Sequence, residues 1–260
     1  MPAPHNPFKH ALRNGTLQLG CWLGLADPYI AEISAGAGFD WLLVDGEHAP
    51  NDLRSIVAQL QVIAARDSHA VVRPPIGETW IIKQLLDAGA QSLLIPMVES
   101  ADQARELVDA VTYPPHGVRG VGSALARASD FAAIGDYLTT ARGEICLLAQ
   151  VENQKGMDAL DGILKVDGID GVFIGPSDLA ADMGFIGQAG AAEVKAAVLG
   201  AMTKIAASGK AAGILTLDTD LQQNCRDIGA TFIATEIDVT SFARTMRGAS
   251  KDASQRLRKT

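Results

Sequence analysis

The sequence Phe39-Asp40-Trp41-Leu42-Leu43-Val44-Asp45-Gly46-Glu47-His48 joins an apolar run directly to two carboxylates and an imidazole. The run from Trp41 to Val44 has the composition of a strand that is buried on both faces. Acidic groups beside an apolar core are costly unless a metal or a polar ligand is bound to them. The segment therefore predicts a buried strand that ends at a chemically active site.

Similar apolar runs recur along the whole chain. Together with the strand above they give eight strand candidates: residues 17–23, 41–45, 70–73, 92–98, 145–151, 171–174, 211–215 and 231–235. Between them, apolar residues at helical spacing mark residues 28–37, 53–64, 80–88, 101–111, 192–207 and 218–228. Eight strands that alternate with helices predict an α/β protein with a TIM (β/α)8 barrel, and 260 residues is an ordinary length for one such barrel. We expect residues 1–260 to form a single catalytic domain.

Composition excludes several classes of partner. A formal net charge of -8 disfavours nucleic acid and anionic membranes, which both select for clustered Lys and Arg. The chain begins without the apolar run of a secretory signal, and no later stretch approaches the roughly 20 apolar residues of a membrane helix. Three widely spaced cysteines predict reduced, buried thiols. These features indicate a cytoplasmic protein with small-molecule partners.

Two segments lie outside the regular alternation of strands and helices. The connection from Val98 to Glu144 is long, and long ordered insertions usually cover a site or an interface. The segment after Phe242 is expected to be mobile or to pack on a neighbour, which includes the exchange of this C-terminal segment between subunits.

Four strand ends carry polar side chains suited to catalysis. In a barrel of parallel strands the active site forms at the carboxyl ends of the strands, so these groups are expected to converge. The second strand ends in Asp45, Glu47 and His48, the third in Arg73, the fifth in Gln150 and Glu152, and the sixth runs into Gly175-Pro176-Ser177-Asp178.

Glu152 and Asp178 would place two hard oxygen ligands on adjacent strands. Such ligands suit Mg²⁺ or Mn²⁺ and also tolerate Co²⁺. Taken singly, each acid has a simpler explanation, because acidic residues commonly occupy the first turn or the cap of a helix. Their convergence with His48 and Arg73 favours a divalent metal ion.

The chain resembles the HpcH/HpaI class II pyruvate aldolases over nearly its whole length. The resemblance rests on FDWLLVDGEHAPN (39–51), VRP (72–74), GVRGVGSALARAS (117–129), AQVENQKG (149–156) and FIGPSDL (173–179). It implies a metal-dependent, reversible retro-aldol cleavage of a 4-hydroxy-2-oxo acid, such as 4-hydroxy-2-oxoheptanedioate or a 2-keto-3-deoxy sugar acid, into pyruvate and an aldehyde. It also implies a homohexamer.

The resemblance assigns roles to the residues at the strand ends. Glu152 and Asp178 match the metal ligands, Arg73 the residue that stabilises charge on the substrate oxygen, and His48 the general base. Asp87 matches a residue that raises the basicity of the histidine, although its helix position requires that it act across a subunit interface. Asp45 is placed to hold a metal-bound water. Further matches are the pyruvate contacts Gln150, Gly175, Pro176 and Ser177, and Leu215 is expected to wall the aldehyde side.

Rival functions stay open at this point. A Schiff-base aldolase needs a lysine at the carboxyl end of a strand, and none is predicted there. A citrate-lyase-like acyl-CoA lyase would share the barrel, the arginine and the two acids, but the His48 motif favours the aldolase. A noncatalytic barrel that binds a keto acid is the alternative from another class. A phosphate-handling barrel lacks a glycine-rich loop with a lysine.

Overall fold

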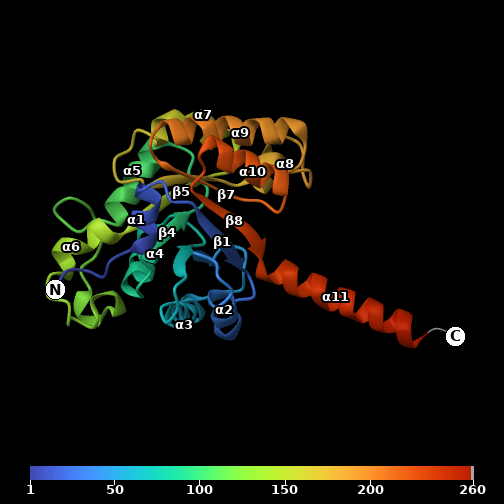
Figure 1. The fold of residues 1–260 in the computed structure, drawn as a ribbon. Coiled ribbons are helices and arrows are strands. Elements are labelled where there is room, and N and C mark those ends of the chain that lie inside the picture. Colours follow the sequence, from blue (N-terminus) through green and yellow to red (C-terminus); the bar gives the residue numbers. More distant parts are fainter. Residues whose placement is uncertain (259–260) are drawn as a thin grey trace.

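Eight parallel strands close into a barrel in this computed structural model, which describes residues 1–258 (Figure 1). Each strand pairs with the next along the chain, and β8 pairs with β1. The predicted TIM barrel is therefore confirmed. The strands are β1 (Gln18–Leu23), β2 (Trp41–Asp45), β3 (His69–Arg73), β4 (Ser92–Ile95), β5 (Cys146–Val151), β6 (Gly171–Ile174), β7 (Ala211–Leu215) and β8 (Phe232–Ile237).

One strand is shorter than predicted, because β4 stops at Ile95 instead of continuing to Val98. Pro96 has no N–H for the strand ladder, and Met97 adopts a left-handed φ of 54°. The turn directs the Met97 N–H at Glu152 Oε1, 3.0 Å away. The early end of β4 thus supplies a backbone donor to a predicted site residue.

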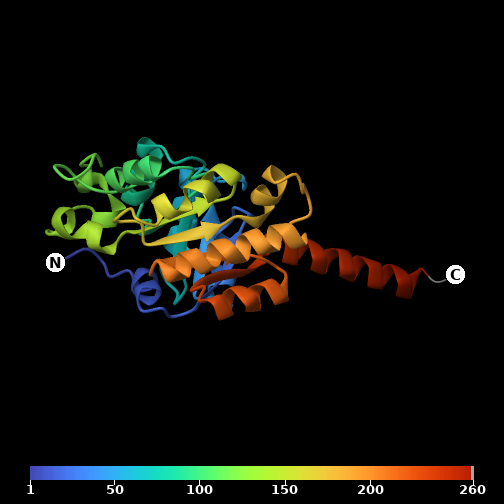
Figure 2. The same ribbon diagram turned by 90° about the horizontal axis from the view of Figure 1, so that it is seen from above.

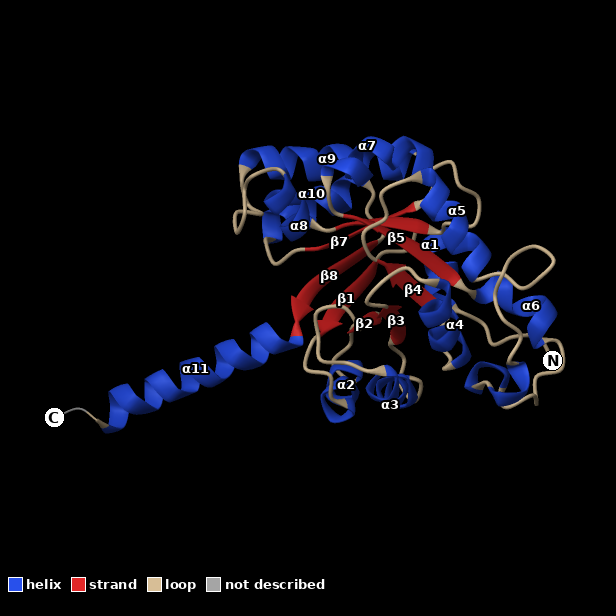
Figure 3. Ribbon diagram, turned by 180° about the vertical axis from the view of Figure 1, so that it is seen from behind, coloured by secondary structure: helices blue, strands red, loops and turns tan. Residues whose placement is uncertain are grey.

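Helices cover the outside of the barrel (Figures 2 and 3). Six of them lie close to their predicted bounds: α2 (Pro28–Ala35), α3 (Leu53–Ile63), α4 (Thr79–Asp87), α5 (Ala101–Ala110), α9 (Ala192–Ala207) and α10 (Thr219–Ile228). Apolar spacing did not predict α1 (Pro7–Arg13), α6 (Tyr137–Glu144), α7 (Gln154–Ile163), α8 (Pro176–Asp182), α11 (Asp238–Leu257) or the 3-10 turns η1 (Ser123–Leu125) and η2 (Arg127–Ser129). The start of α7 had a local signal, since Asn153 caps it by accepting from Gly156 N at 2.8 Å.

The apolar core has two layers. One lies between the strands and the helices, and the other fills the barrel with aromatic side chains. Phe8 of α1 enters this inner layer and meets Phe232 edge to face, with ring centroids 6.1 Å apart. Trp41 packs over Gly20, where a Cβ would lie only 2.2 Å from the indole. A larger residue at position 20 would therefore displace the inner layer.

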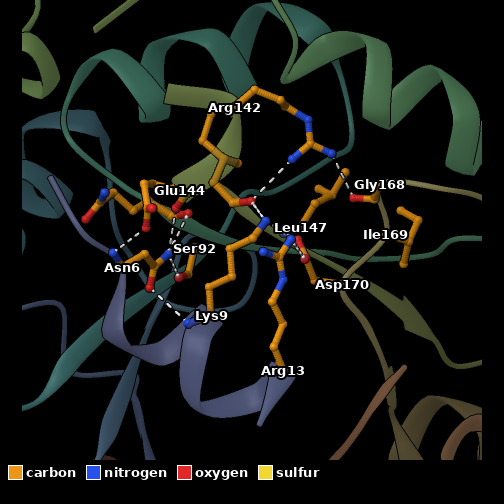
Figure 4. Close-up of polar contacts among 12 residues, drawn as sticks. Asn6, Lys9, Arg13, Ser92, Arg142, Glu144, Leu147, Gly168, Ile169 and Asp170 are labelled. Carbon is orange, nitrogen blue, oxygen red and sulfur yellow. Dashed lines mark hydrogen bonds and ion pairs between the residues drawn. The ribbon is translucent and has the colours of Figure 1, made fainter. Parts of the chain in front are cut away.

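Charged side chains of helix α1 contact the segments that lead into β5 and β6 (Figure 4). Lys9 is 1% exposed, lies 2.9 Å from Asp170 Oδ2 and donates to the carbonyl of Ile145. Asp170 also accepts from Leu147 N at 3.0 Å and pairs with Arg13 at 3.5 Å. Burial lowers the pKa of Lys9, while the charge of Asp170 acts in the opposite direction. The paired charges join α1 to the starts of β5 and β6.

Helix α11 leaves the barrel and extends away from it (Figures 1 and 3). Its start is fixed because Asp238 accepts from Gly24 N at 2.8 Å and Leu25 N at 3.1 Å. Beyond this point the helix exposes Phe242 and Met246 to solvent. The segment after Phe242 is thus helical to Leu257, and its exchange between subunits stays a prediction. Lys259 and Thr260 lie outside the described residues.

Two further expectations can be compared with the structure. Cys21, Cys146 and Cys225 are buried and unbonded, as predicted. Within residues 1–258, no helix combines the length and the apolar character needed to cross a membrane.

Replacing Lys9 by alanine should lower the free energy of unfolding by about 3–5 kcal/mol, because Asp170 would lose its buried partner. Arg13→Ala is the matched control. It removes a cation from the same carboxylate, but Arg13 is 56% exposed and its loss should cost less than about 1 kcal/mol. Urea denaturation measures both variants, and equal losses would contradict a buried, structural role for Lys9.

Candidate active site

A cleft of about 540 Å³ opens at the carboxyl ends of the strands. Residues from β2, β3, β5, β6, β7 and the start of α8 line it, so segments far apart in the sequence meet there. All but one of the predicted site residues are among the lining: Asp45, His48, Arg73, Gln150, Glu152, Gly175, Pro176, Ser177, Asp178 and Leu215.

Asp45 and Arg73 form a buried, two-pronged ion pair at the base of the cleft. The register of β2 and β3 places the two residues directly opposite each other. Arg73 Nε lies 2.9 Å from Asp45 Oδ1, and Nη2 lies 2.7 Å from Oδ2. Burial alone would raise the pKa of Asp45, but the hydrogen bonds and the charge of Arg73 more than offset this and hold it low. The pair is therefore ionised.

Two further groups fix the orientation of Arg73. Trp22 donates its indole N–H to Asp45 Oδ2 at 3.1 Å, and the Arg73 guanidinium lies 4.8 Å from the centre of the same indole ring. On the other side, Arg73 Nη1 lies 2.8 Å from Glu47 Oε2. Trp22 was not among the predicted site residues. Its position one residue before the carboxyl end of β1 could have indicated a place near the cleft.

Asp45 also anchors the turn that follows its own strand. Its Oδ1 accepts from the backbone N–H groups of Glu47 at 3.0 Å and His48 at 3.4 Å. Asp45 therefore holds both Arg73 and the following turn. Its role toward a metal-bound water stays a prediction.

The turn after β2 places His48 at the cleft and Glu47 against Arg73. Gly46 makes this turn by donating to Arg73 O at 2.8 Å, and a Cβ there would lie only 2.7 Å from the same oxygen. The His48 side chain is 68% exposed, and its Nε2 lies 4.0 Å from Glu47 Oε2. Through its contact with Arg73, Glu47 belongs to the same polar network.

Glu152 is a buried carboxylate without a cationic partner among residues 1–258. Its two oxygens accept from Met97 N at 3.0 Å and from the amide of Gln150. Gly175 packs directly against it, since a Cβ there would lie 2.7 Å from Glu152 Oε2. Burial raises the pKa of Glu152, and the charges of Glu47 and Asp178 raise it further against the two hydrogen bonds. Burying the charged form of Glu152 therefore lowers the stability of the folded protein.

The donor set fits a hard divalent cation. Glu152 and Asp178, the latter in the first turn of α8, offer carboxylate oxygens beside the cleft. Gln150 Oε1 is a buried oxygen without a hydrogen-bond partner in the described structure. Burial raises the pKa of Glu47 as well, with Asp178 contributing. A cation would relieve this repulsion, and an oxygen-only set selects Mg²⁺ or Mn²⁺ over softer metals.

Part of the cleft lining is apolar. Leu215, at the end of β7, lines the cleft together with Leu217, Leu221, Ile237 and Val239. Val239 belongs to the first turn of α11, so the C-terminal helix contributes to the cleft.

Asp87 is the one predicted site residue that does not line the cleft. It ends α4, and its Oδ1 lies 2.9 Å from Nη2 of Arg119, which is fully buried. The Arg119 guanidinium lies 4.4 Å from the ring centre of Tyr113 and 5.7 Å from that of Tyr137. Asp87 keeps a quarter of its side chain exposed. Contact between Asp87 and His48 across a subunit interface stays a prediction.

A family model for HpcH/HpaI aldolase/citrate lyase matches residues 18–245. This chain belongs to that family. A hydroxypyruvate/pyruvate aldolase of Roseovarius nubinhibens is 62% identical over 247 residues, covering 95% of this chain and 96% of the relative. A 4-hydroxy-2-oxo-heptane-1,7-dioate aldolase of Salmonella dublin is 55% identical over 239 residues, covering 92% and 91%.

Structural comparison gives the same assignment. An HpcH/HpaI aldolase/citrate lyase family protein from Burkholderia cenocepacia J2315 superposes with a TM-score of 0.91 at 37% identity, covering 95% of this chain and 99% of that one. The family predicted from the sequence is confirmed. The predicted enzyme class, a carbon–carbon lyase of the aldolase type, is likewise confirmed by the relatives.

Metal-free Glu152→Gln protein should be more stable than metal-free wild type at neutral pH. A raised folded-state pKa means that folding disfavours the charged acid, and this penalty is present above that pKa. As pH falls through the raised pKa toward the ordinary value near 4.3, wild type takes up the proton and the difference disappears. Each kcal/mol by which Glu152→Gln raises the free energy of unfolding would raise its Tm by about 2–4 °C. Thermal melts across this pH range test the effect, and a variant less stable at neutral pH would contradict it.

Proposed function

We propose that this protein is a class II pyruvate aldolase that cleaves 4-hydroxy-2-oxo acids reversibly to pyruvate and an aldehyde with a divalent metal ion. One observation carries the proposal: the fixed guanidinium of Arg73 and the unpaired carboxylate of Glu152 face the same cleft. This arrangement suits a reaction in which negative charge develops on a bound oxygen. The names of the close relatives support the same chemistry.

Glu152 and Asp178 would hold the ion, which is Mg²⁺ or Mn²⁺, with Co²⁺ also tolerated. When bound, such an ion supplies Lewis acidity toward the keto and carboxylate oxygens of the substrate. Gln150 and the backbone at Gly175, Pro176 and Ser177 would bind the substrate carboxylate.

Arg73 stabilises the charge that develops on the substrate keto oxygen. Three of its five N–H groups are directed at Asp45 and Glu47, so two remain for a ligand. Because Asp45 and Trp22 already fix the guanidinium, little reorganisation is needed when charge appears.

His48 acts as the general base that takes the proton from the substrate 4-hydroxyl in cleavage and returns it in addition. Its imidazole lines the cleft and is accessible to solvent. Imidazole is suited to both directions because its ordinary pKa lies near neutrality. Asp87 of a second subunit would support this base, within a homohexamer in which the C-terminal segment is exchanged. Residues 1–260 act as one catalytic domain in this arrangement.

The aldehyde would lie against the apolar wall at Leu215. Succinic semialdehyde, tartronate semialdehyde and lactaldehyde are the candidates. The relatives named hydroxypyruvate/pyruvate aldolase add hydroxypyruvate as a second donor to be assayed.

Metal-stripped protein is expected to release pyruvate from 4-hydroxy-2-oxo acids only after Mg²⁺ or Mn²⁺ is restored, and Glu152→Ala should stay inactive at the same metal concentration. A coupled pyruvate assay measures both. Lys155→Ala is the matched control, since Lys155 is exposed and pairs with Glu99 outside the cleft. Release that appears only when coenzyme A is added would favour an acyl-CoA lyase, and binding without turnover would favour a noncatalytic barrel.

A further inference from the structure

Two histidines and a glutamate meet at the amino-terminal end of the barrel, at the end opposite to the cleft. His10 lies on α1, His5 precedes that helix, and Glu144 ends α6. His10 Nε2 lies 3.2 Å from Glu144 Oε2 and 3.4 Å from Oε1, and His5 Nδ1 lies 3.7 Å from Oε2. One ligand atom from each residue lies within 4.8 Å of the others.

We propose that His5, His10 and Glu144 form a second metal site, which binds Zn²⁺. In a tetrahedral site with bond lengths of about 2.0–2.1 Å, neighbouring ligand atoms are roughly 3.3 Å apart. The separations of 3.2 Å and 3.7 Å lie close to this value. Two imidazoles and one carboxylate form a set that suits Zn²⁺, whereas Mg²⁺ selects oxygen ligands.

The two imidazole rings and the carboxylate are held close together. The ring centroids of His5 and His10 lie 4.2 Å apart, with the ring planes tilted by 34°. Glu144 is held in place because Asn6 N donates to its Oε2 at 2.7 Å (Figure 4).

The surroundings leave room for the remaining coordination positions. The His5 side chain is 62% exposed, so waters can complete the coordination sphere. His5 also lines a cavity of about 190 Å³ together with His69, Arg66 and Arg127. The two arginines oppose a cation and limit the affinity of the site. A bound ion would tie the residues before α1 to the end of α6, next to the buried Lys9–Asp170 pair.

Calorimetric titration of Zn²⁺ into the Mg²⁺-loaded enzyme tests this site. Wild type should bind one equivalent of Zn²⁺ that His5→Gln and His10→Gln each weaken at least tenfold, and Zn²⁺ should raise the Tm of wild type more than that of either variant. His116→Gln, at an exposed histidine outside the cluster, should bind as wild type does. Mg²⁺-dependent pyruvate release should be unchanged in all three variants, which also shows that they fold.

Equal Zn²⁺ affinity in wild type and His5→Gln would overturn the proposal, because the ion would then occupy another site, such as the cleft. Absence of Zn²⁺ binding in wild type would overturn it as well. Neither result bears on the aldolase assignment, since the cluster lies outside the cleft. Glu152→Gln separates the two sites: it should leave binding at the histidine cluster unchanged.

Discussion

The Asp45–Arg73 ion pair is the interaction on which the rest of the cleft depends. Neither charge would be stable alone at this depth, and removing one partner of such a pair typically costs about 3–5 kcal/mol. The parallel register of β2 and β3 sets the two residues opposite each other. The Asp45 carboxylate also accepts hydrogen bonds from the backbone of Glu47 and His48. The Asp45–Arg73 ion pair therefore positions both the Arg73 guanidinium and the proposed base, His48.

Buried charged side chains are neutralised at one end of the barrel and not at the other. At the amino-terminal end, Lys9 and Asp170 neutralise each other and lock α1 in place. At the carboxyl end, Glu152 is buried with hydrogen bonds but has no cationic partner among residues 1–258, and burial and neighbouring acids raise its pKa. The first arrangement stabilises the fold, whereas the second costs stability. This cost is the reason we propose that Glu152 holds a cation.

Much of the fold could be predicted from the sequence, because buried parallel strands appear as apolar runs that end in polar residues. The Trp41–Asp45 segment is the clearest example. The short helix α8 was missed because seven residues carry little periodicity, and the end of β4 depends on the turn at Pro96. The predicted barrel implied that the strand ends converge. The contacts of Trp22 with Asp45 and Arg73 could not be predicted, because they depend on side-chain geometry that the spacing of residues along the sequence does not encode.

The most direct test of the account is the exchange of pyruvate methyl protons with deuterium, followed by NMR in the presence of Mg²⁺. If the cleft stabilises the enolate of pyruvate, wild type should exchange these protons much faster than Mg²⁺ in buffer does. Arg73→Lys keeps the positive charge but loses the paired hydrogen bonds to Asp45. The exchange should therefore slow by about 10²–10³-fold. Exchange no faster than in buffer, or unchanged in Arg73→Lys, would contradict the account.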